Sequence, residues 1–234
     1  MLEVTDISAY YGEFQALEKV SLELPDTGVT ALLGANAAGK TTSLRVVSGI
    51  LPAHEGKVTF NGEDITTASS EERVRLGIVQ VPEGRRLFGS LSVEDNLLLG
   101  AFQVRKDKKN RERLDRIYSL LPKLAERRTQ LAGSLSGGEQ QMCAVGRGLM
   151  ADPKVLMIDE MSLGLAPVIV THMFSFVKEI ADSGVSVLLV EQQVQHALQA
   201  ADYATIIEKG VTTHSGSAEE IRDDPKVREA YLGV

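Results

Sequence analysis

Short apolar runs separated by amphipathic stretches dominate the hydrophobic pattern of this 234-residue chain. Three runs rich in apolar and β-branched residues occupy 29–33, 155–158 and 185–190, and a shorter one at 78–81 ends at Pro82. Such runs are typical of strands that are buried on both faces of a parallel sheet. The stretches at 41–48, 71–77 and 168–180 have the spacing of connecting helices. We therefore expect an α/β fold with a parallel sheet.

The flanking segments have different patterns. Residues 4–24 alternate between apolar and polar positions in two runs, and Val58–Gly62 resembles a further strand and turn, so we expect an antiparallel β lobe. From Val93 to about Met150 the pattern is helical, with one apolar stripe at Leu114, Ile117, Tyr118 and Leu121. We expect this region to be a helical lobe inserted between strands of the α/β core.

The segment after residue 190 predicts three further elements. They are a helix, one strand and a terminal acidic helix over residues 218–232. We find no internal repeat, low-complexity tract or flexible linker in the chain.

A phosphate-binding loop lies between the first buried strand and the helix at 41–48. From Gly34 to Thr41 the chain matches G-x-x-x-x-G-K-[ST], in which glycines allow close backbone approach to a polyphosphate. Lys40 would bridge the β- and γ-phosphates, and the Thr41 hydroxyl would bind Mg²⁺. The following helix N-terminus adds partial positive charge. A glycine turn before a helix is the alternative, but the flanking strand favours nucleotide binding.

A second glycine-led helix start occurs at 135–141. Ser136 and Glu139 have capping-box spacing, which predicts a helix that begins at this point. Gly137 and Gly138 leave backbone N–H groups uncovered at the positive helix end, which makes a second anion site. A well-capped helix with no further role is the alternative. Two such helix ends in one chain suggest that one of them serves a nucleotide held by another subunit.

Two carboxylates follow the buried strand 155–158, at the strand end where open α/β sheets bind ligands. Because adjacent strand residues point to opposite faces, Asp159 and Glu160 can have different roles. We expect Asp159 to hold Mg²⁺ through water and Glu160 to orient or deprotonate the attacking water. Acidic residues at strand ends are also common in turns, but the upstream phosphate loop favours catalysis.

Composition and charge narrow the function further. The net charge of −7 disfavours non-specific binding of nucleic acid, although it leaves a local basic patch open. The single cysteine, Cys143, excludes an internal disulfide and fits a reducing cytosol. Four scattered histidines have no ligand-like spacing, so we predict no metal site made of protein ligands alone. Since no run of eighteen apolar residues occurs, we expect no membrane span.

In this order and spacing, the three motif stretches resemble the ATP-binding cassette (ABC) ATPases over essentially the whole chain. The resemblance implies a single ABC ATPase domain over residues 1–234. Its P-loop NTPase core and antiparallel β lobe would comprise 1–82 and 152–234, and its inserted α-helical lobe, which holds the signature motif, would comprise 83–151. The implied ligands are ATP and Mg²⁺, and the implied enzyme is an ATPase whose ATP is sandwiched in a head-to-tail dimer.

The resemblance also assigns individual residues. Tyr11 falls at the adenine-stacking position, although the pattern alone favours simple hairpin packing for it. The implied catalytic residues are Glu160 and Gln192, and the implied Mg²⁺ ligands are Thr41, Glu83 and Asp159. The implied nucleotide-binding residues are Tyr11, Gly34, Asn36, Ala37, Ala38, Gly39, Lys40, Thr41 and Thr42 of one subunit and Ser136, Gly137 and Gly138 of the other.

Shorter segments at 82–88, 162–167, 190–193 and 230–233 resemble the ATP-binding subunit of bacterial branched-chain amino-acid importers. This resemblance implies a second ABC ATPase subunit in a homo- or heterodimer, membrane permease subunits and, indirectly, a periplasmic substrate-binding protein, with no nucleic acid. It places the chain in the cytoplasm, peripheral on the inner face of the cell membrane. Leu87 and Phe88 are candidate permease contacts, and core packing is an equally good interpretation of them.

Three residues depart from the family pattern. Ala37 stands where most cassettes have glycine, and its methyl would crowd the loop at positive φ. Glu83 stands at the position of the Q-loop glutamine. Gln192 stands at the switch histidine, and its neutral amide can donate to a phosphate oxygen but cannot carry charge. These departures motivate an alternative, a nucleotide-gated subunit with little intrinsic hydrolysis.

Two other functions are considered beside these. One is an ABC ATPase of a different transporter. The other is a cassette that acts on DNA or ribosomes, which the acidic charge and the lack of sustained heptads disfavour.

Overall fold

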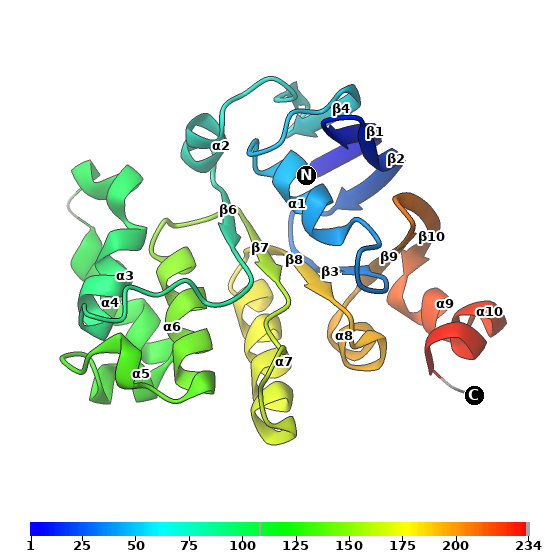
Figure 1. Ribbon diagram of the computed structural model, residues 1–234. Helices are drawn as coiled ribbons and strands as arrows, with labels where there is room; N and C mark the ends of the chain where they lie inside the picture. Colours follow the sequence, from blue (N-terminus) through cyan, green and yellow to red (C-terminus); the bar gives the residue numbers. More distant parts are fainter. Residues whose placement is uncertain (108, 233–234) are drawn as a thin grey trace.

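The computed structural model describes residues 1–107 and 109–232, and the described side chains exclude those of 105–107 and 232. Figure 1 shows three parts: an antiparallel sheet formed mostly by the N-terminal segment, a central, mostly parallel sheet, and a helical lobe drawn in green. None of the described helices combines the length and apolar composition that crossing a bilayer requires.

The antiparallel sheet has the strand order β2-β1-β4-β5. Its strands are β1 (Leu2–Tyr11), β2 (Phe14–Leu24), β4 (Glu55–Phe60) and β5 (Glu63–Asp64). β1 and β2 form a hairpin, which the alternating pattern of residues 4–24 predicts. The predicted strand near Val58 is β4, which pairs with β1.

The central sheet has the order β10-β9-β3-β8-β7-β6, and every neighbouring pair is parallel except β10 with β9. Its strands are β3 (Gly28–Leu33), β6 (Ile78–Val81), β7 (Val155–Asp159), β8 (Ser186–Glu191), β9 (Tyr203–Glu208) and β10 (Val211–Ser217). The four predicted buried strands are β3, β6, β7 and β8. They confirm the expected parallel sheet.

The prediction of one strand after residue 200 is wrong, because the chain forms the hairpin β9–β10 there. Its turn holds Lys209 at φ 49° and Gly210 at φ 82°, a left-handed pair that suits a tight hairpin. β10 is an edge strand of mainly Thr, Ser, His and Gly with no buried residue. It therefore has no apolar alternation from which it could be recognised.

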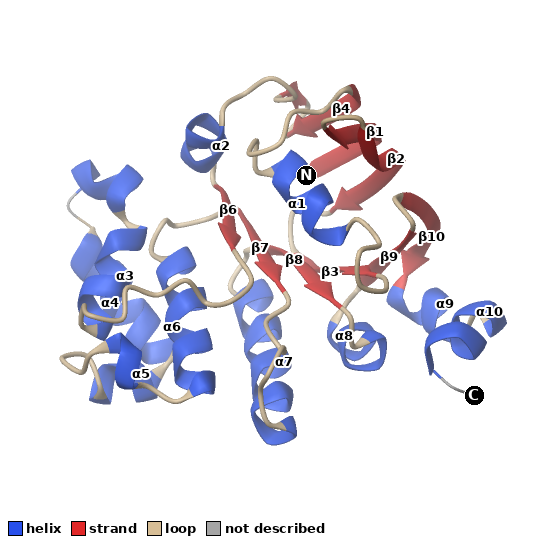
Figure 2. Cartoon of the chain, in the orientation of Figure 1, coloured by secondary structure: helices blue, strands red, loops and turns tan. Residues whose placement is uncertain are grey.

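Side chains of the central sheet alternate between two cores, as the period of a strand requires. Leu156 and Ile158 of β7 enter the core beneath α7 (Pro167–Asp182) and α8 (Val194–Ala200). Val155 and Met157 enter the other core, which α1 (Lys40–Val47) shares with the antiparallel sheet. Figure 2 shows α1 between the two sheets and α7 on the opposite face. This layering positions the start of α1 at the carboxyl ends of the parallel strands.

The helical lobe is inserted between β6 and β7. Its α-helices are α3 (Val93–Gly100), α4 (Asn110–Leu120), α5 (Pro122–Glu126) and α6 (Gly137–Leu149), with 3₁₀ turns η1 (Phe102–Asp107) and η2 (Ala132–Ser134). Of the predicted stripe, Ile117 and Leu121 are buried, and Leu114 and Tyr118 pack partly against the same core. α2 (Ser70–Leu76) precedes β6 and has a capping box at Ser69.

The prediction of one terminal helix over residues 218–232 is also wrong. The segment divides into α9 (Ala218–Asp223), α10 (Pro225–Val227) and a π-helical turn, η3 (Arg228–Leu232). Pro225 has no backbone N–H and forces the preceding residue out of the helical region. Asp224 accordingly has φ −65° and ψ 122°, and its carboxylate caps the next turn. Gly233, which ends the segment 230–233, lies outside the described residues.

Candidate nucleotide-binding and catalytic site

The phosphate loop connects β3 to α1 and packs closely against neighbouring backbone. A Cβ added at Gly34 would lie 2.3 Å from the Ile207 carbonyl oxygen, and one at Gly39 would lie 2.7 Å from the Leu17 side chain. Only glycine fits these two positions. Gly39 also has φ 111° and is the N-cap of α1. The loop therefore presents its N–H groups at a helix N-terminus, the arrangement that binds phosphate.

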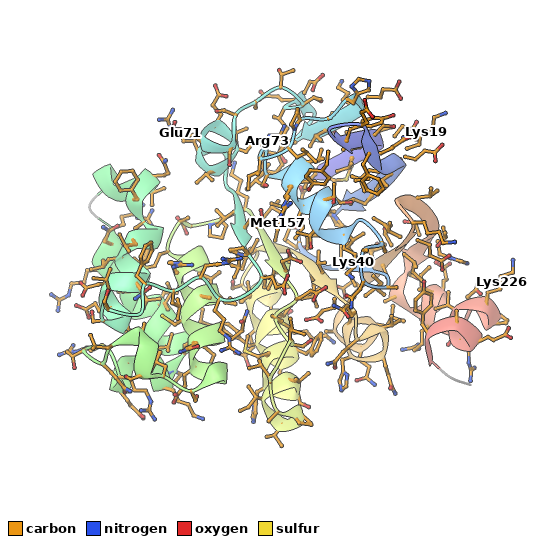
Figure 3. The ribbon with its side chains drawn as sticks, viewed as in Figure 1. Lys19, Lys40, Glu71, Arg73, Met157 and Lys226 are labelled. Carbon is orange, nitrogen blue, oxygen red and sulfur yellow. The ribbon has the colours of Figure 1, made fainter. Side chains whose placement is uncertain are left out.

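Lys40 is buried at the first position of α1, with 4% of its surface exposed. Its Nζ donates to the carbonyl oxygens of Gly34 (2.9 Å) and Ala35 (3.1 Å) and lies 3.5 Å from Oε1 of Glu160. Figure 3 labels Lys40 beside the loop at the ends of the central strands. The ammonium group therefore has three partners that hold it beside the loop.

The two carboxylates at the end of β7 have different environments. Asp159 is 2% exposed, and the Thr41 hydroxyl donates to its Oδ1 at 3.4 Å. The pKa of Asp159 is raised to about 6, chiefly by burial; the Thr41 bond and the charge of Lys40 oppose this shift, whereas the charges of Glu160 and Glu83 contribute to it. A bound cation would replace this unfavourable environment with a favourable one.

Glu160 follows β7 in a left-handed conformation, with φ 47°. Its Oε2 accepts a hydrogen bond of 2.6 Å from Nε2 of Gln192, which follows β8. With Lys40 at Oε1, both oxygens of this carboxylate have partners. Gln192 therefore orients Glu160 across the ends of two adjacent strands.

A cavity of about 820 Å³ runs along the phosphate loop, within the size range of small-molecule sites. It brings together most of the predicted site residues: Tyr11, Asn36, Ala37, Ala38, Gly39, Lys40, Thr41, Thr42, Glu83, Glu160 and Gln192. Gly34 lies behind it as an acceptor for Lys40, and Asp159 lines the adjoining groove next to Thr41 and Glu83. Residues that the sequence did not indicate also line it: Phe14, Gln15, Ala16, Leu163 and Lys209.

The second helix end lies outside this cavity. Ser136 and Glu139 form the predicted capping box at the start of α6. Ser136, Gly137 and Gly138 do not line the cavity at Lys40. The guanidinium of Arg85 lies beside Gly137 and donates to Oε1 of Gln140 at 2.9 Å. One chain thus presents two separate helix N-termini that begin at glycine-containing segments.

Ala37 adopts φ 62°, the left-handed conformation in which its methyl group is expected to crowd the loop. For a residue with a Cβ this conformation costs roughly 1–2 kcal/mol. The loop therefore stores backbone strain at the position where most cassettes have glycine.

Sequence reasoning missed the buried carboxylate of Glu191. It is 1% exposed and accepts from the Ser162 backbone N–H (3.1 Å) and hydroxyl (2.7 Å), and its burial raises its pKa. Glu191 fixes the loop after Glu160 to the end of β8. Glu191 comes directly after the apolar run of a buried strand. The same position after a strand identified Asp159, so this rule could also have identified Glu191.

The residues around Thr41 fit a magnesium ion that is shared with phosphate. Hydroxyl and carboxylate oxygens are the donors that Mg²⁺ prefers, and it usually keeps waters and substrate oxygens as its other ligands. Thr41, Asp159 and Glu83 supply oxygens of this kind around one groove. Among the residues that the structure describes, no group of three or more His, Cys, Asp or Glu could hold a metal alone.

Comparison with known proteins identifies the family. Residues 17–162 match the family model described as ABC transporter. The high-affinity branched-chain amino acid transport ATP-binding protein BraG of Pseudomonas aeruginosa is 43% identical over 233 residues, with both chains covered completely. The chain belongs to the ABC transporter ATP-binding family. The cassette is therefore an ATP-binding, ATP-hydrolysing transporter subunit, which confirms the family prediction.

Solved structures and further relatives support the same assignment. A nucleotide-free ATP-binding cassette and the ADP conformation of a cassette are each 30% identical, cover 100% of this chain and 99% of their own, and have TM-scores of 0.88 and 0.89. They confirm the predicted fold class. The lipopolysaccharide export system protein LptB of Escherichia coli is 34% identical over 227 residues, covering 96% of the cassette and 93% of LptB. Residues 215–234 match a model described as branched-chain amino acid ATP-binding cassette transporter.

Proposed function

We propose that the cassette is the ATP-hydrolysing subunit of an importer for branched-chain amino acids. The single observation that supports this best is the 43% identity to BraG along both complete chains. The match of residues 215–234 to the branched-chain model supports it independently. The similarity to LptB, an export protein, is lower, at 34%.

In the proposed reaction, the cassette binds MgATP at the phosphate loop. Lys40 and the N–H groups that begin α1 bind the β- and γ-phosphates. Mg²⁺, when bound near Thr41 and Asp159, neutralises phosphate charge. As Lys40 turns to the γ-phosphate, Oε1 of Glu160 loses its ion pair and becomes free to take a proton from the attacking water.

Gln192 has two tasks in this proposal. Its amide holds Oε2 of Glu160 in the strand-end geometry, and it can donate to a γ-phosphate oxygen. Because glutamine does not titrate, this donor stays neutral at every working pH.

Two surface features of the cassette support the proposed partner subunits. The start of α6 lies outside the cassette's own cavity, which supports a head-to-tail dimer in which each signature helix completes the other subunit's site. A groove of about 410 Å³ at the lobe junction is lined by the exposed side chains Phe88, Leu99 and Phe102. An apolar groove of this kind supports docking of the membrane permeases. In this proposal the cassette lies at the inner face of the membrane, and a periplasmic binding protein delivers the substrate.

A second candidate function is an ATP-gated subunit that hydrolyses little by itself. It is favoured by three neighbours in one site: Ala37 at positive φ, Glu83 near the magnesium position, and neutral Gln192. Hydrolysis by the purified cassette, alone and mixed with a candidate partner ATPase, separates the two functions. Turnover by the isolated cassette would dismiss the second.

Glu160→Gln tests the catalytic assignment. Losing a general base lowers turnover by about 10²- to 10⁴-fold, while MgATP affinity should persist because Lys40 and the N–H groups of the loop remain to bind the phosphates. Phosphate release and calorimetric titration measure the two quantities. Glu112→Gln, an exposed residue on α4, is the matched control and should behave as wild type. Normal hydrolysis by the Glu160 variant would show that another group is the base.

Transport is tested with the cassette reconstituted in vesicles together with candidate permease subunits. Leucine, isoleucine or valine, delivered by the cognate binding protein, should accumulate in an ATP-dependent manner. Accumulation should be lost with Lys40→Ala. ATP-dependent movement of lipid instead of amino acid would refute the importer assignment without touching the ATPase assignment.

A further inference from the structure

Two aromatic side chains stand opposite one another at the closed end of the β1–β2 hairpin. Tyr11 and Phe14 are cross-strand partners that flank the two-residue turn, and both line the nucleotide cavity. Directly opposed residues of an antiparallel pair project from the same face, with Cβ atoms about 5 Å apart. The hairpin end therefore places two aromatic residues at the cavity.

The two rings differ in how they are held. Arg45 of α1 fixes Tyr11, because its Nη1 donates to the Tyr11 hydroxyl at 2.9 Å and its guanidinium carbon lies 5.9 Å from the ring centroid. Phe14 is 70% exposed, the largest exposed fraction among the large hydrophobic residues, and no described aromatic ring stacks on it. A single exposed phenylalanine is unremarkable in itself. Here it lies in the cavity that holds Lys40.

The distance from the phosphate loop to Phe14 suits the nucleoside part of a nucleotide rather than its phosphates. Ala16, two residues further along β2, has its carbonyl oxygen 3.4 Å from the position of a Cβ added at Gly39 of the phosphate loop. Two residues of strand span about 7 Å. A nucleotide whose phosphates lie in the loop would therefore extend its nucleoside end along β2 toward Phe14.

We propose that Phe14 is the second ring of a two-ring stacking platform, with Tyr11, for the nucleobase. The proposal deepens the proposed function and rests on nucleotide binding at Lys40. Stacking on an aromatic face does not depend on the hydrogen-bonding edge of the base. The platform therefore selects by ring area: a bicyclic purine covers both rings, whereas a pyrimidine covers one.

A fluorescence experiment tests contact with the base directly. The cassette contains no tryptophan, so Phe14→Trp gives a single indole at the platform. Its emission should change when MgADP binds and should stay constant when magnesium pyrophosphate fills the phosphate loop. An emission that is indifferent to MgADP at saturating concentration would overturn the proposal.

Calorimetry with a pair of variants measures the contribution of the ring. Phe14→Leu keeps apolar bulk and removes the π face, and should weaken MgADP binding about 5- to 150-fold, the range for one base stacked on one ring. Phe14→Tyr should bind as wild type. Tyr203→Leu, at an exposed aromatic residue of β9 that does not line the nucleotide cavity, is the control and should leave the MgADP affinity unchanged. Wild type should bind MgADP more tightly than MgCDP, and the ratio of the two affinities should fall only in Phe14→Leu.

The outcomes separate this proposal from the proposed function. If wild type binds MgADP and Phe14→Leu binds it within twofold, the platform is refuted and nucleotide binding stands. If Phe14→Leu weakens pyrophosphate as much as MgADP, the ring supports the fold and not the base, and the platform is again refuted. If folded wild type binds no MgADP, nucleotide binding fails and the platform fails with it.

Discussion

Replacing Arg73 should destabilise the cassette more than replacing any exposed arginine. Arg73 lies on α2 and is 2% exposed. Its guanidinium makes five hydrogen bonds to backbone carbonyls: Ala68 (3.1 Å), Val46 (2.7 Å), Val47 (2.8 Å), Ile65 (2.7 Å) and Thr66 (2.7 Å). Figure 3 shows Arg73 directed toward the body of the molecule and Glu71 directed away from it. Two of the acceptors end α1, the helix that begins at the phosphate loop.

The magnitude follows from the number of carbonyls left without a donor. Arg73→Met leaves all five without this donor, and at a net contribution of about 1–1.5 kcal/mol for each hydrogen bond it should cost about 5–7.5 kcal/mol. Arg73→Lys keeps the charge but offers three N–H donors in place of five, so at least two bonds are lost at roughly 1–1.5 kcal/mol each, or about 2–3 kcal/mol. Both are large fractions of a typical total of about 5–15 kcal/mol.

Urea unfolding followed by circular dichroism measures both losses as shifts of the midpoint at constant m. Arg75→Met is the matched control on the same helix, because the Arg75–Glu71 pair (2.6 Å) is 61% and 57% exposed and should contribute no more than about 1 kcal/mol. The reasoning is refuted if Arg73→Met costs less than 1 kcal/mol, or if Arg75→Met costs as much as it does.

Three further predictions concern titration at the site and in the core. Gln192→His should give turnover an ionisation near pH 6.5 that wild type lacks, with activity falling as the imidazolium loses its proton; a pH–rate profile checks it, and identical profiles would contradict it. Burial raises the pKa of Asp159 to about 6 from 3.8, so the free energy of unfolding should fall by about 3 kcal/mol as pH rises from roughly 4 to 6. Asp159→Asn should lack that loss. Urea unfolding of both proteins near pH 4 and pH 6 checks this, and the prediction is wrong if wild type and variant lose the same free energy of unfolding between the two pH values. Cys143 is buried and its thiol pKa is raised to about 11, so a disulfide reagent should label it only after unfolding; rapid labelling of native protein would be contrary to this.

The parallel core and the phosphate site are predictable because their signals are local. β3, β7 and β8 are buried on both faces, so each contains a run of mainly apolar residues, which Thr30 interrupts in β3. The motif around Lys40 lies within a few residues of one such run, and the structure has the expected strand–loop–helix arrangement there. Asp159 and Glu160 are likewise identified by their place at a strand end.

Features that depend on distant partners are not predictable in this way. Arg73 looks like any basic helix residue, and only the fold reveals that five carbonyls from two segments, the end of α1 and the loop 65–68, surround it. Gln192 can be recognised by resemblance, but its bond to Glu160 spans 32 positions of sequence. β10 is an edge strand whose polar residues give no pattern. The break at Pro225 was available from sequence, because proline lacks the required N–H.

The helical lobe leaves and rejoins the central sheet at neighbouring strands. β6 ends at Val81 and β7 begins at Val155, and the two strands pair directly in parallel register. A single helix suffices for such a crossover, and α6 packs on both strands. Helices α3, α4 and α5 are therefore an elaboration that the sheet does not need for its own pairing. Replacing these helices with the corresponding helices of another cassette should alter which membrane partner the cassette binds, while the residues of the hydrolytic site keep their positions.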